Sequence, residues 1–295
     1  MQAQDRINAI SRMLDGGLGE KPMLGGYRLE KELGKGAMGV VYLGRDAKIN
    51  RVVAIKTLAL ARGFDEHELA DVKENFFREA ETAGRLKHPD IVSIFAVGGK
   101  DDLAYIAMEF LQGKDLVRFT RPGNLLPLEK VVSIIARVAL ALSYAHENLV
   151  VHRDIKPANI MYEASSDKVT VTDFGIARIN DGIKTGMLLG TPSYMSPEQL
   201  AGKKIDGRSD LFSLGVTLYQ LVCGQLPFSG DSLTQLLFRI ANEAHPDICT
   251  LMPGVPRSLG KIIDRALAKN VEARYLTGIE MACDLHNCLM KADRA

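Results

Sequence analysis

The sequence predicts an α+β fold in which a β-rich lobe comes first and a mainly helical lobe follows, with a cleft at the join. Between residues 27 and 110, short runs rich in β-branched and aromatic residues end at glycine or charged turns, which is typical of strands. From residue 128 onward, apolar residues mostly recur at helical spacing over long stretches. This separation of strands from helices indicates two lobes.

The N-terminal segment is predicted to be a short amphipathic helix followed by a linker. Ile7, Ile10 and Leu14 stand at helical spacing, and the stretch "DGGLGEKPMLGG" after them is typical of a flexible connection. We assign residues 1–24 to this extension and linker and expect the ordered domain to begin at Tyr27. The extension could dock on the domain, mediate a dimer or stay disordered.

The first lobe, residues 25–112, is predicted to contain one helix among its strands. The helix covers residues 66–86, where Phe76 and Ala83 mark an apolar face. The strands are "YRLEKEL", "VVYLGRD", "VVAIKTL", "IVSIFAV" and "LAYIAMEF". The second lobe, residues 113–292, has a small β-rich island around residues 149–173, and its long helices are predicted at residues 128–146, 208–223, 232–242, 259–269 and 278–290.

Composition places the chain among globular enzymes and excludes other classes. Of its 295 residues, 46% are hydrophobic and 25% are charged, and the net charge of +1 gives no argument for a nucleic-acid partner. No apolar run reaches the ~18 residues that span a bilayer, and the N-terminus lacks the apolar core of a signal peptide. We therefore expect a cytoplasmic chain, which could be part of a longer membrane-anchored protein. The four cysteines form no C-x-x-C pair, so no zinc site or redox motif is predicted.

A glycine-rich turn near the start of the first lobe indicates a phosphate site. In "LGKGAMGVVYLG", Gly34, Gly36 and Gly39 have G-x-G-x-x-G spacing, and glycines let backbone N–H groups approach phosphates closely. A dinucleotide-binding fold needs a helix after these glycines, but the segments that follow, "VVYLGRD" and "VVAIK", are strand-like. This context favours a glycine-rich hairpin that covers a nucleoside triphosphate.

Lys56 ends the apolar run "VVAIK" and needs an anionic partner in a strand. Phosphate oxygens would serve, and so would a carboxylate on the predicted helix. Among the glutamates of that helix, Glu79 shares the apolar face, whereas Glu74 and Glu81 are turned away from it. A solvated surface charge is the alternative interpretation of Glu79.

The stretch "VVHRDIKPANIMYE" concentrates polar groups between apolar segments. Asp154 can accept a proton from an attacking hydroxyl, and Lys156 can hold the charge of a transferred phosphate. Asn159 can bind a metal ion, and a carboxylate at Asp173 in "VTVTDFGIAR" suits Mg²⁺, which prefers oxygen ligands. Arg153 adds a fixed cation beside the proton acceptor. Together these residue types predict phosphoryl transfer.

These elements and the downstream "SPE" occur in the order and spacing of a known family. Over residues 27–290 the sequence resembles the eukaryote-like serine/threonine protein kinases, and most of all their bacterial members. The resemblance implies the bilobal protein kinase fold and ATP as the phosphate donor. It also implies Mg²⁺ as the cofactor, with Mn²⁺ as the alternative ion, and serine or threonine hydroxyls of proteins as the acceptors.

The resemblance implies catalytic roles for residues of both lobes. Lys56 would contact the α- and β-phosphates of ATP and pair with Glu79. Asp154 would orient or deprotonate the substrate hydroxyl. The implied catalytic residues are Asp154, Lys156, Lys56 and Glu79, and the implied metal ligands are Asn159 and Asp173.

The resemblance implies a nucleotide site as well. Adenine would lie between Val41 and Ala54 on one side and Met161 on the other, with Met108 guarding the pocket behind it. Glu109 and Leu111 would hydrogen-bond the base through their backbone groups. The implied nucleotide-binding residues are Gly34, Lys35, Gly36, Ala37, Gly39, Val41, Ala54, Lys56, Met108, Glu109, Leu111 and Met161.

Three structural contacts are implied in the second lobe. His152 and Phe174 would pack in the column of side chains that the active state assembles. Glu198 would pair with Arg274. A buried carboxylate at Asp210 would hydrogen-bond the backbone of the catalytic loop, because a buried aspartate without a partner is hard to explain.

Regulation is predicted from the segment before "GTPSYMSPE". Lys156 and this segment resemble serine/threonine kinases rather than tyrosine kinases, and Thr191 would bridge Asp154 and Lys156. Arg153 is a cation against which a phosphate on the activation segment can dock. We therefore predict that Thr185 is an activating autophosphorylation site, for which a homodimer is one arrangement. A plain exposed threonine is the alternative.

Two other functions are weighed against an active protein kinase. A pseudokinase would bind nucleotide or act as a scaffold without turnover, but such proteins usually lose groups that Lys56, Asp154 and Asp173 supply here. A small-molecule kinase is disfavoured by the long segment "GTPSYMSPEQ", which resembles a platform for peptide substrates.

Overall fold

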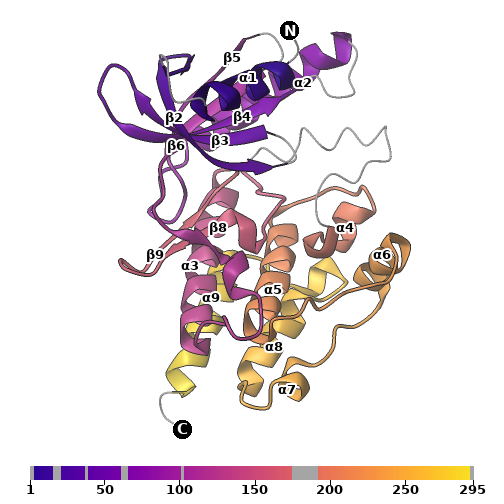
Figure 1. Cartoon of the computed structure of the whole chain (residues 1–295). Coiled ribbons are helices and arrows are strands. Elements are labelled where there is room, and N and C mark those ends of the chain that lie inside the picture. Colours follow the sequence, from indigo (N-terminus) through magenta and orange to yellow (C-terminus); the bar gives the residue numbers. More distant parts are fainter. Residues whose placement is uncertain are drawn as a thin grey trace. The chain divides into compact units, whose positions relative to one another are not determined.

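The computed structural model of the chain describes residues 3–15, 21–36, 39–60, 66–100, 103–174 and 192–292. The chain divides into two compact units, the first made of Met1–Lys87 with Val92–Gln112 and the second of His88–Ile91 with Gly113–Ala295. The first unit is built on a β-sheet and the second is mainly helical (Figure 1). The α+β class predicted from the sequence is therefore confirmed.

The first unit carries an antiparallel six-stranded sheet in the order β1-β2-β3-β4-β6-β5. The predicted strands are all present, but "IVSIFAV" begins later than expected. Ile91, which belongs to the second unit, instead forms an isolated bridge with Val171 of that same unit, and the strand begins at Ile94. The elements of the first unit are α1 Ala3–Asp15, β1 Met23–Leu24, β2 Tyr27–Gly36, β3 Gly39–Asp46, β4 Val52–Ala59, α2 Glu66–Gly84, β5 Ile94–Lys100 and β6 Leu103–Glu109.

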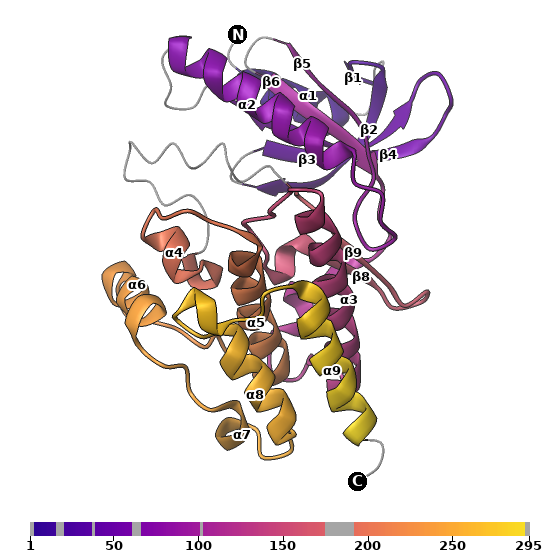
Figure 2. The ribbon, with the colours of Figure 1, turned by 180° about the vertical axis from the view of Figure 1, so that it is seen from behind.

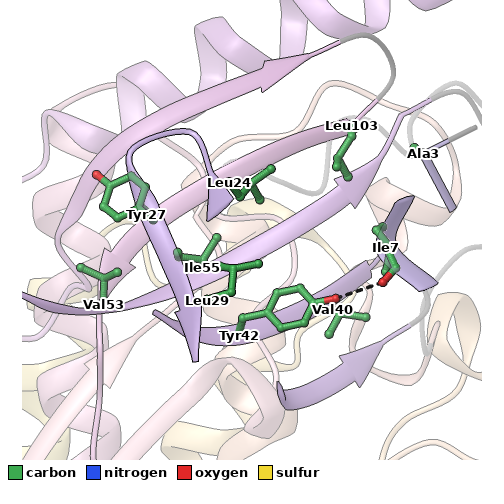
Figure 3. Close-up of a cluster of buried hydrophobic side chains, with 11 residues drawn as sticks. Ala3, Ile7, Leu24, Tyr27, Leu29, Val40, Tyr42, Val53, Ile55 and Leu103 are labelled. Atoms are coloured by element: carbon green, nitrogen blue, oxygen red, sulfur yellow. Dashed lines mark hydrogen bonds between the residues drawn. The ribbon is translucent and has the colours of Figure 1, made fainter. Parts of the chain in front are cut away.

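Helix α1 is part of the first unit, so packed residues precede Tyr27, where the ordered domain was expected to begin, and docking on the domain is the alternative that the described residues show. Ala3 and Ile7 of α1 are buried in one cluster with side chains of β2, β3, β4 and β6 (Figure 3), and Ile10 and Leu14 pack against that cluster. The predicted helix therefore docks on the sheet, because an apolar stripe this short gains stability mainly from a tertiary partner.

The two helices of the first unit lie on opposite faces of its sheet, as Figures 1 and 2 show from opposite sides. Val53 and Ile55 of β4 belong to the cluster beneath α1. Because successive strand residues point to opposite faces, Ala54 and Lys56 belong to the face away from α1.

The second unit is organised around α5, whose residues are buried along nearly the whole helix. A helix that is apolar on all sides needs neighbours on all sides. Its neighbours include α3 and α8. Helix α3 in turn packs closely against α9, where a Cβ atom on Gly278 would stand 1.9 Å from the carbonyl oxygen of Ala139. The elements are β7 Lys114–Asp115, α3 Leu128–Glu147, β8 Ile160–Glu163, β9 Lys168–Val171, α4 Pro197–Leu200, α5 Gly207–Cys223, α6 Leu233–Asn242, α7 Ile248–Leu251, α8 Arg257–Ala266 and α9 Gly278–Ala292.

Candidate active site

The predicted phosphate loop is a hairpin formed by β2 and β3. Gly36 pairs with Gly39 at its tip, and Gly34 pairs with Val41 further down. A Cβ atom on Gly39 would stand 1.7 Å from the carbonyl oxygen of Thr57, so packing alone requires glycine there. At Gly34 a Cβ atom would meet no protein atom within 4 Å. Gly34 therefore borders open space, and its contact with a phosphate stays a prediction.

The predicted nucleotide residues of the first unit share one face of the sheet. Lys56 is paired across the sheet with Val41 on one side and Ile106 on the other, and Ala54 is paired with Met108. Residues directly opposite each other in an antiparallel pair point the same way. The sequence therefore brings a cation and the predicted adenine-contacting side chains to the face away from α1. Lys35 lies exposed beside Gly34 and Gly36, paired with Val40.

Glu79 is the glutamate of α2 that best fits the predicted pairing with Lys56. Phe76 and Ala83 are buried along one face of the helix, and Glu79 is partly buried between them, whereas Glu74 and Glu81 are exposed. Burial along α2 therefore confirms the predicted apolar face. The pairing itself stays a prediction.

The segment after β6 was predicted to hold adenine through its backbone. The N–H group of Glu109 donates to the carbonyl oxygen of Ser93 at 2.9 Å. A hydrogen bond from the base to this residue would therefore use its carbonyl oxygen. Leu111 is partly buried two residues further on. Met161, the residue predicted on the other side of adenine, is partly buried in β8.

The predicted catalytic residues of the second unit come together in one cluster. The ammonium of Lys156 lies 2.7 Å from Oδ2 of Asp154. The Nδ2 group of Asn159 donates to the same oxygen at 3.0 Å and to the carbonyl oxygen of Asp154 at 2.8 Å. All three residues lie within a stretch from Asp154 to Asn159, and both Lys156 and Asn159 contact the carboxylate of Asp154.

The backbone that precedes Asp154 is held in place by hydrogen bonds to Asp210. The carboxylate of Asp210, which is 0% exposed, accepts the N–H groups of His152 at 2.8 Å and Arg153 at 2.7 Å, and it bonds the ring of His146 at 2.8 Å. Burial by itself would raise the pKa of Asp210, but the hydrogen bond and charge of His146, the charge of His152 and the backbone donor hold this pKa below its ordinary value. The predicted anchoring role of Asp210 is confirmed.

The two predicted metal ligands are joined through Thr172. Its N–H group donates to the carbonyl oxygen of Asn159 at 2.9 Å, and its carbonyl oxygen bonds the ring of His152 at 2.7 Å. Asp173 follows directly with φ of +64°, a left-handed conformation that is uncommon outside glycine. The rings of His152 and Phe174 meet edge to face at 4.6 Å, so this predicted contact is confirmed.

The residues around the catalytic loop include anchors that the sequence reasoning missed. Arg153 also has a left-handed φ of +68°, and its carbonyl oxygen accepts Nε2 of Gln199 at 2.8 Å. Gln199 in turn closes a capping box with Ser196 at the start of α4. The pattern S-x-x-Q is a recognised signal for such a cap, but only the fold shows that the same amide reaches Arg153. His146 was missed in the same way.

Glu198 and Arg274 form the predicted ion pair in the second unit. Their side chains meet through two hydrogen bonds of 2.7 and 2.8 Å. Arg274 is buried and Glu198 nearly so, and Ser209 donates a further hydrogen bond to Glu198. Burial alone would raise the pKa of Glu198, but its hydrogen bonds with Arg274 and Ser209 lower it to about 2.

Some predicted residues lie outside the described part of the chain. They are Ala37 of the glycine-rich turn and the regulatory residues Thr185 and Thr191. Within the described residues, no group of three or more histidine, cysteine, aspartate or glutamate side chains could hold a metal ion. A site for Mg²⁺ on Asn159 and Asp173 would therefore depend on oxygen atoms of a substrate, as is usual for this ion.

This arrangement is that of a protein kinase. A family model described as the protein kinase domain matches residues 27–284, so the chain belongs to that family. Among curated relatives it is 36% identical over 263 residues to the probable serine/threonine-protein kinase PknB of Lactococcus lactis, which covers 88% of this chain and 41% of the relative. It is likewise 36% identical over 277 residues to the serine/threonine-protein kinase PrkC of Bacillus subtilis, covering 93% and 42%.

The fold is also similar to that of a solved kinase domain. The solved PknI kinase domain of Mycobacterium tuberculosis matches with a TM-score of 0.75 and 30% identity, over 92% of this chain and 100% of that one. The chain thus belongs to the protein kinase family, and the curated relatives named here are serine/threonine kinases. It spans about two fifths of the length of the curated relatives named here.

Proposed function

We propose that the chain transfers the γ-phosphate of ATP to serine or threonine hydroxyls of proteins. The observation that carries this proposal is the cluster of Asp154, Lys156 and Asn159 on a backbone anchored by Asp210. Phosphoryl transfer needs little covalent chemistry from a protein, so catalysis comes from positioning and charge neutralisation. This cluster supplies a proton acceptor and a cation within hydrogen-bonding distance of each other.

The proposed reaction begins with a substrate hydroxyl hydrogen-bonded to Asp154. The oxygen of this hydroxyl attacks the γ-phosphorus of ATP. The bond between the γ-phosphorus and the oxygen that joins it to the β-phosphate breaks, and the hydroxyl proton passes to the carboxylate of Asp154. Lys156, 2.7 Å from that carboxylate, would balance negative charge on the phosphate in transit. Lys56 would bind the α- and β-phosphates, with Glu79 positioning it.

The donor set fits a hard divalent cation. Both hydrogen bonds from the Asn159 side chain to Asp154 use Nδ2, so its amide oxygen is the atom that would bind metal, together with the carboxylate of Asp173. Mg²⁺, or alternatively Mn²⁺, would neutralise charge on the phosphates when bound. The hydrogen bond from Thr172 to Asn159 holds these two ligands in a fixed relation.

The direct test is phosphate transfer by the whole chain. Incubation with ATP, Mg²⁺ and a general serine- and threonine-containing substrate protein should give phosphoserine or phosphothreonine detectable by mass spectrometry, and a chelator should abolish it. Nucleotide binding without any transfer would instead support the pseudokinase alternative. Among the described residues, no helix has the length and apolar character to cross a membrane.

The two kinds of glycine in the hairpin predict different outcomes. Gly34→Ala adds a methyl group in open space, so we expect thermal stability to stay within about 1 kcal/mol of wild type while ATP affinity falls severalfold. Gly39→Ala forces a Cβ atom against Thr57 and should destabilise the protein by about 1–3 kcal/mol. Thermal unfolding and calorimetric titration with ATP measure both effects. Unchanged ATP affinity in Gly34→Ala would contradict the proposed role of Gly34, and equal stability loss in the two variants would contradict the open space around it.

Activation is proposed to follow autophosphorylation of Thr185, within a homodimer or between freely colliding copies. A phosphate there would dock on Arg153, whose backbone is fixed by Asp210 and Gln199. Thr191 is proposed to bridge Asp154 and Lys156.

Thr185→Ala is expected to lower activity about tenfold or more, the effect of losing one or two charge-assisted hydrogen bonds. Thr185→Ser keeps the hydroxyl and should retain both phosphorylation and activity. Mass-spectrometric phosphosite mapping and initial rates check the prediction. Full activity of Thr185→Ala would rule out this switch.

A further inference from the structure

Helix α1 is an addition to the kinase domain, because it precedes residues 27–284, which the family model matches. It packs on the sheet face opposite Lys56, where Ala3 and Ile7 are 2% and 0% exposed. Figure 3 shows Ile7 reaching the cluster that contains Leu29, Val40 and Tyr42. The helix therefore contacts the two strands that form the glycine-rich hairpin.

Ser11 makes the polar part of this contact. Its hydroxyl donates to the carboxylate of Glu32 in β2 at 2.8 Å and lies 3.1 Å from the hydroxyl of Tyr42 in β3. Glu32 and Tyr42 are direct partners across the β2–β3 ladder. One side chain of α1 thus bridges both strands of the hairpin at a single rung.

The Glu32–Tyr42 pair lies directly beside the glycine-rich part of the hairpin. The ladder shifts register between Glu32 and Gly34, and the next pairs, from Gly34 to Gly36, carry the proposed phosphate-binding glycines. A bulge kinks a strand and increases its local twist. Ser11 therefore holds the last regular pair before the kink, at the base of the segment that would cover the phosphates.

The buried hydroxyl of Tyr42 depends on α1 as well. Tyr42 is 0% exposed, and its hydroxyl donates to the carbonyl oxygen of Ile7 at 3.4 Å besides its contact with Ser11. Burial raises the pKa of Tyr42, which keeps the hydroxyl protonated. Both of these partners belong to α1, so the helix satisfies a polar group that the sheet buries.

We propose that α1 is a clamp that holds the glycine-rich hairpin in its ATP-binding conformation, and that Ser11 is a positioning residue for ATP. This inference rests on the proposed function of the chain as an ATP-dependent kinase. Weakening the clamp would lower the fraction of molecules whose hairpin is ready for ATP, and apparent affinity falls by the same fraction. Protein-substrate binding, which the second unit is proposed to carry, would not change.

Ser11→Ala tests the clamp in the full chain. We expect KM for ATP to rise about five- to tenfold, the effect of losing one such hydrogen-bonded contact, with KM for the protein substrate unchanged. Ser11→Thr keeps the hydroxyl and should restore the ATP value. Met13→Ala, an exposed change on the same helix, is the matched control. Tyr42→Phe removes the Ser11–Tyr42 contact but leaves the hydrogen bond from Ser11 to Glu32. It should also raise KM for ATP, and the two effects should add to less than their sum in the double variant, because both changes remove that shared contact.

Hydrogen exchange of the nucleotide-free protein tests the clamp without activity. Amides of β2 and β3 near the glycines should exchange faster in Ser11→Ala than in wild type or Met13→Ala. Unchanged exchange there would overturn the inference, and so would an unchanged KM for ATP in an active Ser11→Ala enzyme. An inactive wild-type chain would count against the proposed function alone, because the exchange comparison would still decide whether α1 holds the hairpin.

Discussion

Asp154→Asn is expected to lower the rate of phosphate transfer by about 10²–10⁴-fold, the usual contribution of a positioned general base. Asparagine keeps an oxygen that can accept the hydrogen bonds Lys156 and Asn159 now give to Oδ2 of Asp154. The cluster should therefore persist while the proton acceptor is lost. The initial rate at saturating ATP, with circular dichroism to confirm the fold, measures this effect.

Asp231→Asn is the matched control for this substitution. Asp231 is an exposed carboxylate before α6, so the same chemical change there should leave the rate as it is. If Asp154→Asn transferred phosphate within tenfold of wild type, proton transfer to this residue would be excluded. If wild type and variant were equally inactive, the kinase proposal itself would fail.

Glu198→Gln is expected to destabilise the protein by about 3–5 kcal/mol, because it leaves the guanidinium of Arg274 buried without its counter-charge. The side chain of Arg274 is 0% exposed, and Glu198 binds it through two hydrogen bonds. Urea unfolding followed by circular dichroism measures the loss. The position is not in the catalytic cluster, so the prediction concerns stability.

Glu272→Gln provides the comparison. Glu272 pairs with Arg208 at 3.0 Å, but its side chain is 74% exposed, and exposed ion pairs contribute about 0–1 kcal/mol. The same glutamate-to-glutamine change should therefore cost several kcal/mol at one site and almost nothing at the other. Similar losses at both positions would show that burial does not govern the Glu198 pair.

The difference in stability between wild type and Glu198→Gln should depend on pH in a definite direction. The pKa of Glu198 falls from 4.5 in the unfolded chain to about 2 in the folded one, so the folded state favours the ionised carboxylate. The resulting stability, about 2 kcal/mol after allowance for partial solvent contact, is fully present above pH 4.5 and is lost as pH falls toward 2. The gap between wild type and Glu198→Gln should stay constant from pH 7 to 5 and narrow below 4.5.

Local patterns in the sequence predicted most of the elements. The period of apolar residues located α3, α5 and α9 to within a residue or two of their observed bounds, because one buried face is enough to fix a helix. The pattern failed at the start of β5, where Ile91 pairs with Val171 instead of continuing the strand. Apolar composition is the same in both settings, so only the partner distinguishes them.

The cluster of the candidate active site was also predictable, for a different reason. Asp154, Lys156 and Asn159 lie within one short loop, so their closeness in sequence already brings them close in space. The resemblance to kinases predicted the pairing of Glu198 with Arg274, which are far apart in the sequence. Gln199 and His146 were not identified, because their contacts with Arg153 and Asp210 join segments far apart in the sequence.

The sequence by itself determined the chemical groups of the candidate active site and the helical character of residues 3–15. Only the tertiary structure decided that this helix lies on the sheet face opposite Lys56 and that Ser11 reaches both strands of the glycine-rich hairpin. The physical reason is that an amphipathic stripe specifies a need for burial but not a partner. The partner is chosen by the shape and polar groups of the surface it meets, here Glu32 and Tyr42 at one rung of the sheet.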